Sequence, residues 1–118
     1  MQPKITSITI TVHNLDRAYR FYKDVFELPF EQILIESDHI AFFFEQGISV
    51  VLMEGVIEEP SLMFTQEATS TLEVDQLIRR AREAGAEIVE VPLEEQGTYA
   101  GMFQDLDGYH WEVISWNT

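Results

Sequence analysis

The chain has 118 residues, of which 46% are hydrophobic and 24% are charged, with 4 Pro and 6 Gly. This composition is typical of one globular domain over residues 1–118 and excludes a disordered or collagen-like chain. The absence of cysteine excludes disulfides and thiolate zinc sites, and a formal net charge of -14 excludes nucleic acid and anionic membranes as expected partners.

The first predicted elements are a strand and a helix. Residues 7–12, SITITV, alternate hydroxyl and apolar side chains, which is the period-two pattern of a strand with two different faces. Asn14 can cap a helix after this strand, and Pro29 can end it. The apolar residues of the helix follow the spacing of one stripe that packs on a sheet: Leu15, Ala18, Tyr19, Tyr22, Val25 and Phe26.

Three short segments rich in Ile, Phe and Val come next, and each predicts a strand. They read FEQILIES, HIAFFFEQ and ISVVLME, with a turn at Gly47 between the last two. Module one, at about residues 1–54, therefore has the order βαβββ. Residues 55–61 are polar, contain Pro60 and predict a connector.

The same order is predicted for module two, at about residues 62–118. LMFTQEAT predicts a strand, and STLEVDQLIRRAREAG predicts a helix that begins with the capping pair Ser70 and Glu73 and stops at Gly85. AEIVEV, YAGMFQD and HWEVIS predict three further strands. The two modules share the order of their elements but little sequence identity. The predicted fold class is α+β.

The faces of the strands indicate where a ligand would bind. If Ile8, Ile10 and Val12 pack under the first helix, the hydroxyl side chains between them must face the other side of the sheet. A sheet with helices on one face and a curved second face makes a cavity, which is a usual place for a ligand. The residues predicted on that second face include Ser7, Thr9, Met63, Thr65 and Glu67.

Three stretches carry a resemblance to a known family. VHNLDRAYRFYKDVFEL in the first half, and STLEVDQLIRRAREAGAEIVEVP and GTYAGMFQDLDGYHWEVISWN in the second, are similar to the vicinal oxygen chelate superfamily. That superfamily includes glyoxalase, bleomycin-resistance proteins, fosfomycin-resistance proteins and extradiol dioxygenases. Leu106 departs from the usual Pro of the tail motif. We expect its turn to survive, because Gly108 supplies the positive φ and Asp105 and Asp107 can accept bonds from turn amides.

The resemblance implies two βαβββ modules that form a curved mixed eight-stranded sheet around a pocket, with the helices on the outer face. It also implies a homodimer in which modules of two chains complete each cavity. Superfamily enzymes commonly hold a divalent metal with His or Glu side chains from the first and last strands of each module.

By this resemblance, the metal-ligand positions fall on four residues of this chain. They are Ser7, either Leu52 or Met53, Met63, and Glu112 in the WEV stretch. One carboxylate beside a hydroxyl, a thioether and an aliphatic or second thioether group does not suit a catalytic divalent ion. We therefore expect no metal cofactor.

Several residues have two possible roles, one in ligand or metal binding and one in structure alone. Glu112 can contact a ligand or be a solvated acid, and His110, which shares its strand face, can be half of an unorthodox metal site or a rim histidine. Phe43 belongs to a run of three aromatic residues, which fills a core or offers a stacking platform for a ligand. Glu67 can add a second carboxylate to the cavity or face water.

The positions of the cations favour binding over catalysis on an anionic substrate. Apart from Lys4, all Lys and Arg residues lie in the two predicted helices, whereas glutathione adducts and phosphonates need a cation in the pocket. The leading hypothesis is a metal-free protein that binds a neutral or cationic, partly aromatic small molecule. The ligand-contact residues expected under this hypothesis are Ser7, Thr9, Phe43, Leu52, Met63, Thr65, Glu67, His110 and Glu112.

Two other functions remain open from the sequence. One is a lyase like lactoylglutathione lyase, or a dioxygenase, with the non-standard metal set His110, Glu112 and Glu67. The other is a structural or regulatory dimer with a vestigial cavity. The apolar run at 40–44 is far shorter than the ~20 residues that cross a bilayer, and the N-terminal stretch does not resemble a signal peptide, so we expect a cytoplasmic protein.

Overall fold

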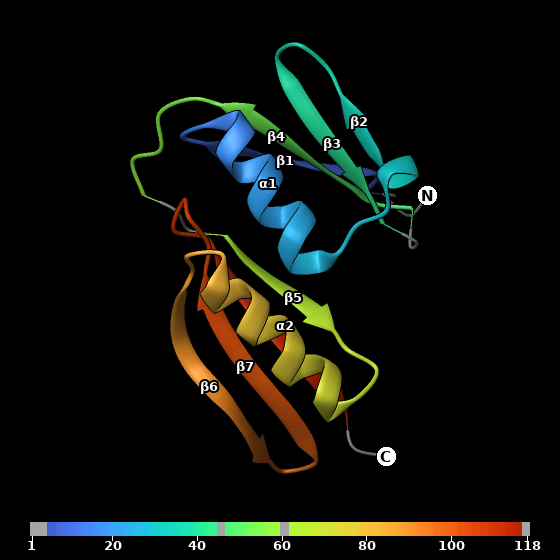
Figure 1. The fold of residues 1–118 in the computed structure, drawn as a ribbon, viewed down its shortest axis with the longest axis vertical. Coiled ribbons are helices and arrows are strands. Elements are labelled where there is room, and N and C mark those ends of the chain that lie inside the picture. The colour runs from blue at the N-terminus through green and yellow to red at the C-terminus, as the bar shows by residue number, and fades with distance from the viewer. Residues whose placement is uncertain (1–4, 45–46, 60–61, 117–118) are drawn as a thin grey trace. The chain divides into compact units, whose positions relative to one another are not determined.

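The computed structural model describes residues 5–44, 47–59 and 62–116, and it contains two helices and eight strands (Figure 1). The first module holds β1 (Ser7–Val12), α1 (Leu15–Phe26), the 3-10 turn η1 (Phe30–Gln32), β2 (Ile33–Ile35), β3 (His39–Phe43) and β4 (Ser49–Glu54). The second module holds β5 (Met63–Glu67), α2 (Thr71–Glu83), β6 (Glu87–Glu95), β7 (Thr98–Gln104) and β8 (His110–Trp116). The predicted α+β class with two βαβββ modules is confirmed.

The eight strands form two mixed four-stranded sheets, one in each module. The strand orders are β1-β4-β3-β2 and β5-β8-β7-β6, and in both sheets the first strand of the module pairs in parallel with the last. The described residues fall into two compact units, and the boundary after Glu58 lies inside the predicted connector; residues Asp24–Phe26 group with the second unit. None of the described helices is long and apolar enough to cross a membrane.

The core of the first module lies between α1 and one face of its sheet. Ile10 and Val12 on that face are almost completely buried, as their alternation in β1 predicts, and Leu52 of β4, which pairs with Ile10, is buried beside them. Phe42 of β3 lies in the same layer, and its ring stacks with Tyr19 and meets Tyr22 edge-on. These aromatic contacts fix which face of the sheet the helix covers.

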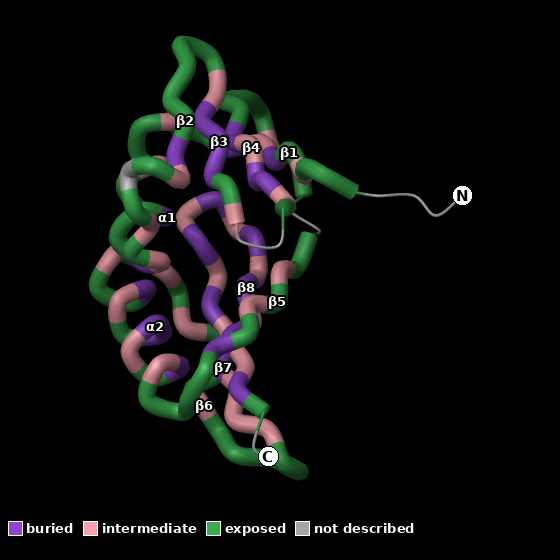
Figure 2. The backbone as a smooth tube through the Cα atoms, turned by 90° about the vertical axis from the view of Figure 1, so that its right-hand side faces the viewer, coloured by how far each residue is buried: buried purple, intermediate pink, exposed green. Residues whose placement is uncertain are grey.

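The core of the second module is built in the same way between α2 and its sheet. Val74, Leu77, Ile78 and Ala81 form the buried stripe of the helix. In Figure 2, buried residues alternate with partly exposed ones along β7 and β8, as expected for strands with one face in the core. The buried residues of these two strands include Phe103, Trp111 and Val113.

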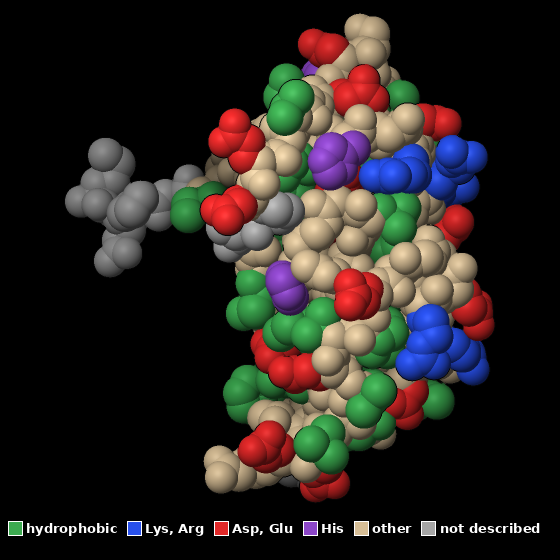
Figure 3. Space-filling model, turned by 90° about the vertical axis from the view of Figure 1, so that its left-hand side faces the viewer, with side chains coloured by type: hydrophobic (Ala, Val, Ile, Leu, Met, Phe, Trp, Pro, Cys, Tyr) green, Lys and Arg blue, Asp and Glu red, His purple; other side chains and the backbone are tan. Residues whose placement is uncertain are grey.

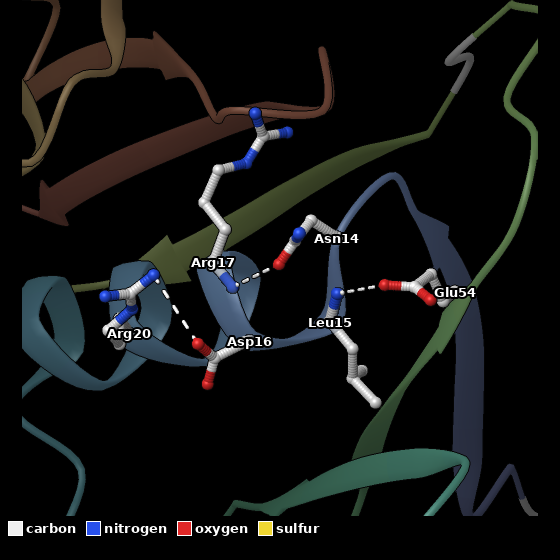
Figure 4. Close-up of polar contacts among 6 residues, drawn as sticks. All are labelled: Asn14, Leu15, Asp16, Arg17, Arg20 and Glu54. Carbon is white, nitrogen blue, oxygen red and sulfur yellow. Dashed lines mark hydrogen bonds and ion pairs between the residues drawn. The ribbon is translucent and has the colours of Figure 1, made fainter.

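Both predicted helix starts are confirmed. The Asn14 side chain accepts a hydrogen bond from the Arg17 N–H at 2.8 Å, and Glu54 Oε1 accepts one from the Leu15 N–H at 2.9 Å (Figure 4). Two N–H groups without partners inside the helix are thereby satisfied. Because Glu54 is the last residue of β4, its bond also ties the end of that strand to the start of the helix.

The second helix uses half of the predicted capping box. Ser70 Oγ accepts a hydrogen bond from the Glu73 N–H at 3.1 Å, whereas the Glu73 carboxylate accepts one from the Thr69 hydroxyl at 2.7 Å. Gly85 has a φ of 103°, so the predicted left-handed stop is confirmed.

Two element boundaries differ from the sequence patterns. Helix α1 ends at Phe26, before Pro29, because Glu27 adopts the left-handed conformation with a φ of 51°. The FEQILIES stretch forms the 3-10 turn η1 and then only the three-residue strand β2. Apolar content alone did not indicate where the extended conformation begins in that stretch.

Candidate functional site

We call the face of each sheet that is turned away from its helix the open face of that module. On the first open face, Ser7 pairs with Ser49 and Ser49 pairs with Phe43. Thr9 lies in the next row of that face, opposite Val51. Phe43 is 45% exposed, so its ring is not part of the described core.

The register between β1 and β4 decides between Leu52 and Met53. Leu52 pairs with Ile10 and is 0% exposed, so it lies on the helix side and not with Ser7 and Thr9. Met53 pairs with Thr11 and therefore belongs to the first open face. The expectation that Leu52 contacts a ligand is wrong, because side chains of directly paired residues lie on the same side of a sheet and Leu52 shares the helix side with Ile10.

The strand pairings of the second module define rows of side chains across its open face. The central row contains Thr65, Glu112, Met102 and Glu90, one from each strand. The row on one side contains Met63, His110, Gln104 and Glu87, and the row on the other side contains Glu67, Ile114, Ala100 and Leu93. The register therefore places Met63, Thr65, Glu67, His110 and Glu112 on the same face of the second sheet.

Glu112 is the central residue of this face. It is partly buried, and its Oε1 accepts a hydrogen bond from the Thr65 hydroxyl at 3.2 Å across the β5–β8 pairing. Its second oxygen can accept bonds from a ligand. Neighbouring positions on a strand face lie roughly 7 Å apart, so His110 is close enough to bind the same small molecule.

The turn between β7 and β8 holds Glu112 on this face. Asp105 is 6% exposed, and its Oδ1 accepts hydrogen bonds from the N–H groups of Asp107 at 3.0 Å and Tyr109 at 2.9 Å. Its Oδ2 accepts one from the Trp111 indole N–H at 3.0 Å. The expected bonds from turn amides to Asp105 are present, and Gly108 has the expected positive φ of 94°.

Trp111 is anchored on the helix side by rings as well as by Asp105. Its ring stacks with Phe64 at a centroid distance of 4.4 Å and with Phe103 at 6.3 Å. Because neighbouring residues of a strand point to opposite faces, a buried Trp111 places His110 and Glu112 on the open face.

Three residues of the second open face were missed by the sequence analysis. Met102, Gln104 and Ile114 are partly buried and directly pair with or flank Glu112 and His110. The alternation in YAGMFQD carries the signal for Met102 and Gln104, since Phe103 marks the core side, and the alternation in HWEVIS carries it for Ile114. The pairing register between β7 and β8 was needed to place Met102 beside Glu112 and Gln104 beside His110.

The charges of the second module are divided between its helix and its open face. Arg79, Arg80 and Arg82 lie on α2, whereas the described open-face positions carry acids and no Lys or Arg. In Figure 3, the Lys and Arg side chains form compact groups, while Asp and Glu are spread over the view. The acids on the second open face are Glu67, Glu87, Glu90, Glu95 and Glu112.

A family model decides the classification. Residues 4–113 match the model described as Glyoxalase/Bleomycin resistance protein/Dioxygenase superfamily. This chain belongs to that superfamily. The comparison with curated proteins gave no match.

Solved structures with the same fold include the following three proteins. A hypothetical protein from S. aureus is 26% identical with a TM-score of 0.82, and the alignment covers 98% of this chain and 94% of that one. A glyoxalase-related enzyme from Fulvimarina pelagi is 19% identical with a TM-score of 0.84, covering 97% and 88%. The fosfomycin resistance protein FosX from Listeria monocytogenes is 22% identical with a TM-score of 0.80, covering 98% and 94%.

The metal positions implied by the superfamily do not fit a divalent ion in this chain. With Met53 in place of Leu52, the four positions supply a hydroxyl, two thioethers and the carboxylate of Glu112. Hard divalent ions require oxygen or nitrogen donors in larger number. Within the described residues, no group of three or more His, Cys, Asp and Glu side chains could hold a metal, so His110, Glu112 and Glu67 do not form such a set.

Two titratable groups away from these positions have shifted pKa values. A hydrogen bond between Asp38 and the His39 ring lowers the pKa of Asp38. A 2.6 Å hydrogen bond from the Tyr99 hydroxyl to the Asp75 carboxylate raises the pKa of Tyr99. The second contact joins β7 to α2 on the helix side of the sheet.

Proposed function

We propose that this member of the glyoxalase superfamily is a metal-free binding protein for a neutral or cationic, partly aromatic small molecule. The second open face is the proposed binding surface. The observation that carries the proposal is the central, partly buried Glu112 on a face whose described positions include no Lys or Arg. An anionic ligand would meet carboxylates and no Lys or Arg at the described positions of this face, whereas a cation would gain a charge-assisted hydrogen bond.

The same face offers apolar surface for the rest of the ligand. Met63, Met102 and Ile114 lie next to His110 and Glu112 in the pairing. Small-molecule sites typically combine such apolar surface with a few polar groups that set orientation. A homodimer in the cytoplasm, with small organic molecules as its ligands, is the assembly and location that we propose with this function.

Ligand charge is the decisive variable for a first experiment. We expect ethidium, an aromatic cation, to raise the melting temperature of the purified protein in a concentration-dependent way. The aromatic anion 8-anilinonaphthalene-1-sulfonate should give no such rise. Equal responses to both compounds would show that the face does not select by charge and would contradict the proposal.

Variants test whether Glu112 is responsible. Glu112→Gln keeps an oxygen that can accept the Thr65 bond, and we expect it to weaken ethidium binding by about tenfold. Glu94→Gln is the matched control, since Glu94 pairs with Tyr99 on the helix side and its loss removes the same charge. An equal loss in both variants would point to net charge instead of a site.

Elemental analysis tests the metal-free part of the proposal. We expect no stoichiometric Ni, Zn, Mn or Fe in protein purified without chelators. A tightly bound ion at one equivalent, lost in Glu112→Gln, would favour a metal-dependent lyase or dioxygenase instead.

A further inference from the structure

The methionines of this chain have an unusual distribution. Met1 lies outside the described residues, and the other three all lie on open faces. Met53 pairs with Thr11, Met63 with His110, and Met102 with Glu112. The described buried apolar residues include none of them, although Met is a common filler of cores.

Two of these side chains flank the candidate site. Met102 lies directly across from Glu112 on β7, and directly paired residues have Cβ atoms roughly 5 Å apart. Met63 lies directly across from His110 on β5 and is 57% exposed. Met102 therefore lies beside Glu112 and Met63 beside His110, and each side chain keeps at least part of its surface exposed.

Thioethers suit the ligand class proposed above. Sulfur is polarisable, the side chain has three rotatable bonds, and S–aromatic contacts are favourable, so Met adapts to rings of different shape. Leu or Ile at these positions would give the same apolar area without sensitivity to oxidants. The placement of Met on the face, and of Phe, Val and Leu in the core, favours a role at the site.

We propose that Met63 and Met102 contact the aromatic part of the ligand, and that their oxidation to methionine sulfoxide by hydrogen peroxide turns binding off. This inference rests on the proposed function at Glu112. It adds a modification site and a form of regulation to that function.

The chemical step is an oxygen-atom transfer. A lone pair of the thioether sulfur attacks one peroxide oxygen, the O–O bond breaks, an S–O bond forms, and the second oxygen leaves as water after proton transfer. The sulfur loses two electrons and the peroxide gains them. The methionine sulfoxide product is polar and chiral. Methionine sulfoxide reductases reverse the oxidation, so it can act as a switch.

Peptide mapping can follow the three methionines separately. A protease that cleaves after Glu, but not before Pro60, gives the peptides 46–54, 59–67 and 96–112, each with one Met. Wild-type protein is treated with graded hydrogen peroxide, the sulfoxide at each position is measured by mass spectrometry, and ethidium affinity is measured by fluorescence titration. We expect affinity to fall by about tenfold as Met63 and Met102 become oxidised.

Variants assign the effect to these residues. The double variant Met63→Leu with Met102→Leu keeps apolar surface but loses the sulfur–aromatic contacts, so we expect it to bind ethidium about threefold more weakly than the reduced wild type and to show no further loss of affinity after peroxide treatment. Met53→Leu is the matched control and should respond to peroxide as the wild type does. Methionine sulfoxide reductase should restore affinity in the wild type.

Each result has a defined meaning. If oxidised wild-type protein keeps its affinity, or if the double variant loses affinity to the same extent, the switch is refuted while the proposed function stands. If ethidium binds to neither oxidised nor reduced protein, or binds independently of Glu112, both proposals are overturned.

Discussion

The two open faces differ in chemistry although the two modules share one order of elements. The described face of the first sheet carries hydroxyl and apolar groups such as Ser7, Thr9 and Phe43, and its strand positions include no carboxylate. The second face is centred on Glu112 and carries five acids in its strand pairings: Glu67, Glu87, Glu90, Glu95 and Glu112. The backbone pattern thus fixes where a face lies, while the outward residues of each strand decide what it can bind.

The largest expected effect comes from the turn that keeps Glu112 on the second face. Asp105→Asn replaces Oδ2 with an amide group that cannot accept the Trp111 indole bond. A buried donor is then left without its charged partner, and we expect the free energy of unfolding to fall by about 3 kcal/mol. Denaturant unfolding followed by circular dichroism measures this loss.

The control variant Asp24→Asn tests whether the destabilisation comes from the turn or from the loss of one negative charge. Asp24→Asn removes an exposed acid of α1 and should shift the free energy of unfolding by less than about 0.5 kcal/mol. Equal stability of the two variants would mean that Asp105 does not hold the turn.

The elements and the central residue of the face could be predicted from the sequence. Strict alternation in SITITV and HWEVISW fixed the two faces of β1 and β8, and Asn14, Ser70 and Gly85 marked helix ends by local chemistry. Pairing between strands that are distant in sequence could not be read in this way. Leu52 and Met102 were therefore misplaced or missed, because their neighbours depend on register and not on local pattern.

The helix caps allow the two modules to be compared at equivalent positions. Asn14→Ala and Ser70→Ala each remove one side-chain acceptor from a helix start, and each should cost about 1 kcal/mol of unfolding free energy. Thermal unfolding of both variants gives the comparison. A much larger cost at Asn14 would mean that Glu54 cannot hold the start of α1 alone.

Glu54 sharpens this comparison, because it supplies the first helix with a second acceptor from β4. Glu54→Gln keeps an oxygen for the Leu15 N–H but removes the negative charge near the positive end of the helix. We expect a loss of about 0.5 kcal/mol, which should shrink as salt is added. If the loss of unfolding free energy does not depend on salt, the Glu54 bond stabilises the helix through its geometry and not through its negative charge.

The smallest expected effect concerns Tyr99, which joins β7 to α2 in the second module. The hydrogen bond to the Asp75 carboxylate raises the pKa of Tyr99, because ionisation would place two negative charges side by side. The pKa of Tyr99 in the folded protein lies above its unfolded value of about 10. The contact therefore stabilises the fold at a pH below the unfolded pKa, and this stabilisation is lost as the pH rises through the folded pKa. The difference in tyrosinate absorbance between the wild type and Tyr99→Phe reports the titration of Tyr99. Asp75→Asn should lower the pKa of Tyr99 towards the unfolded value. If Asp75→Asn leaves the titration unchanged, the hydrogen bond between Tyr99 and Asp75 is not the cause of the raised pKa.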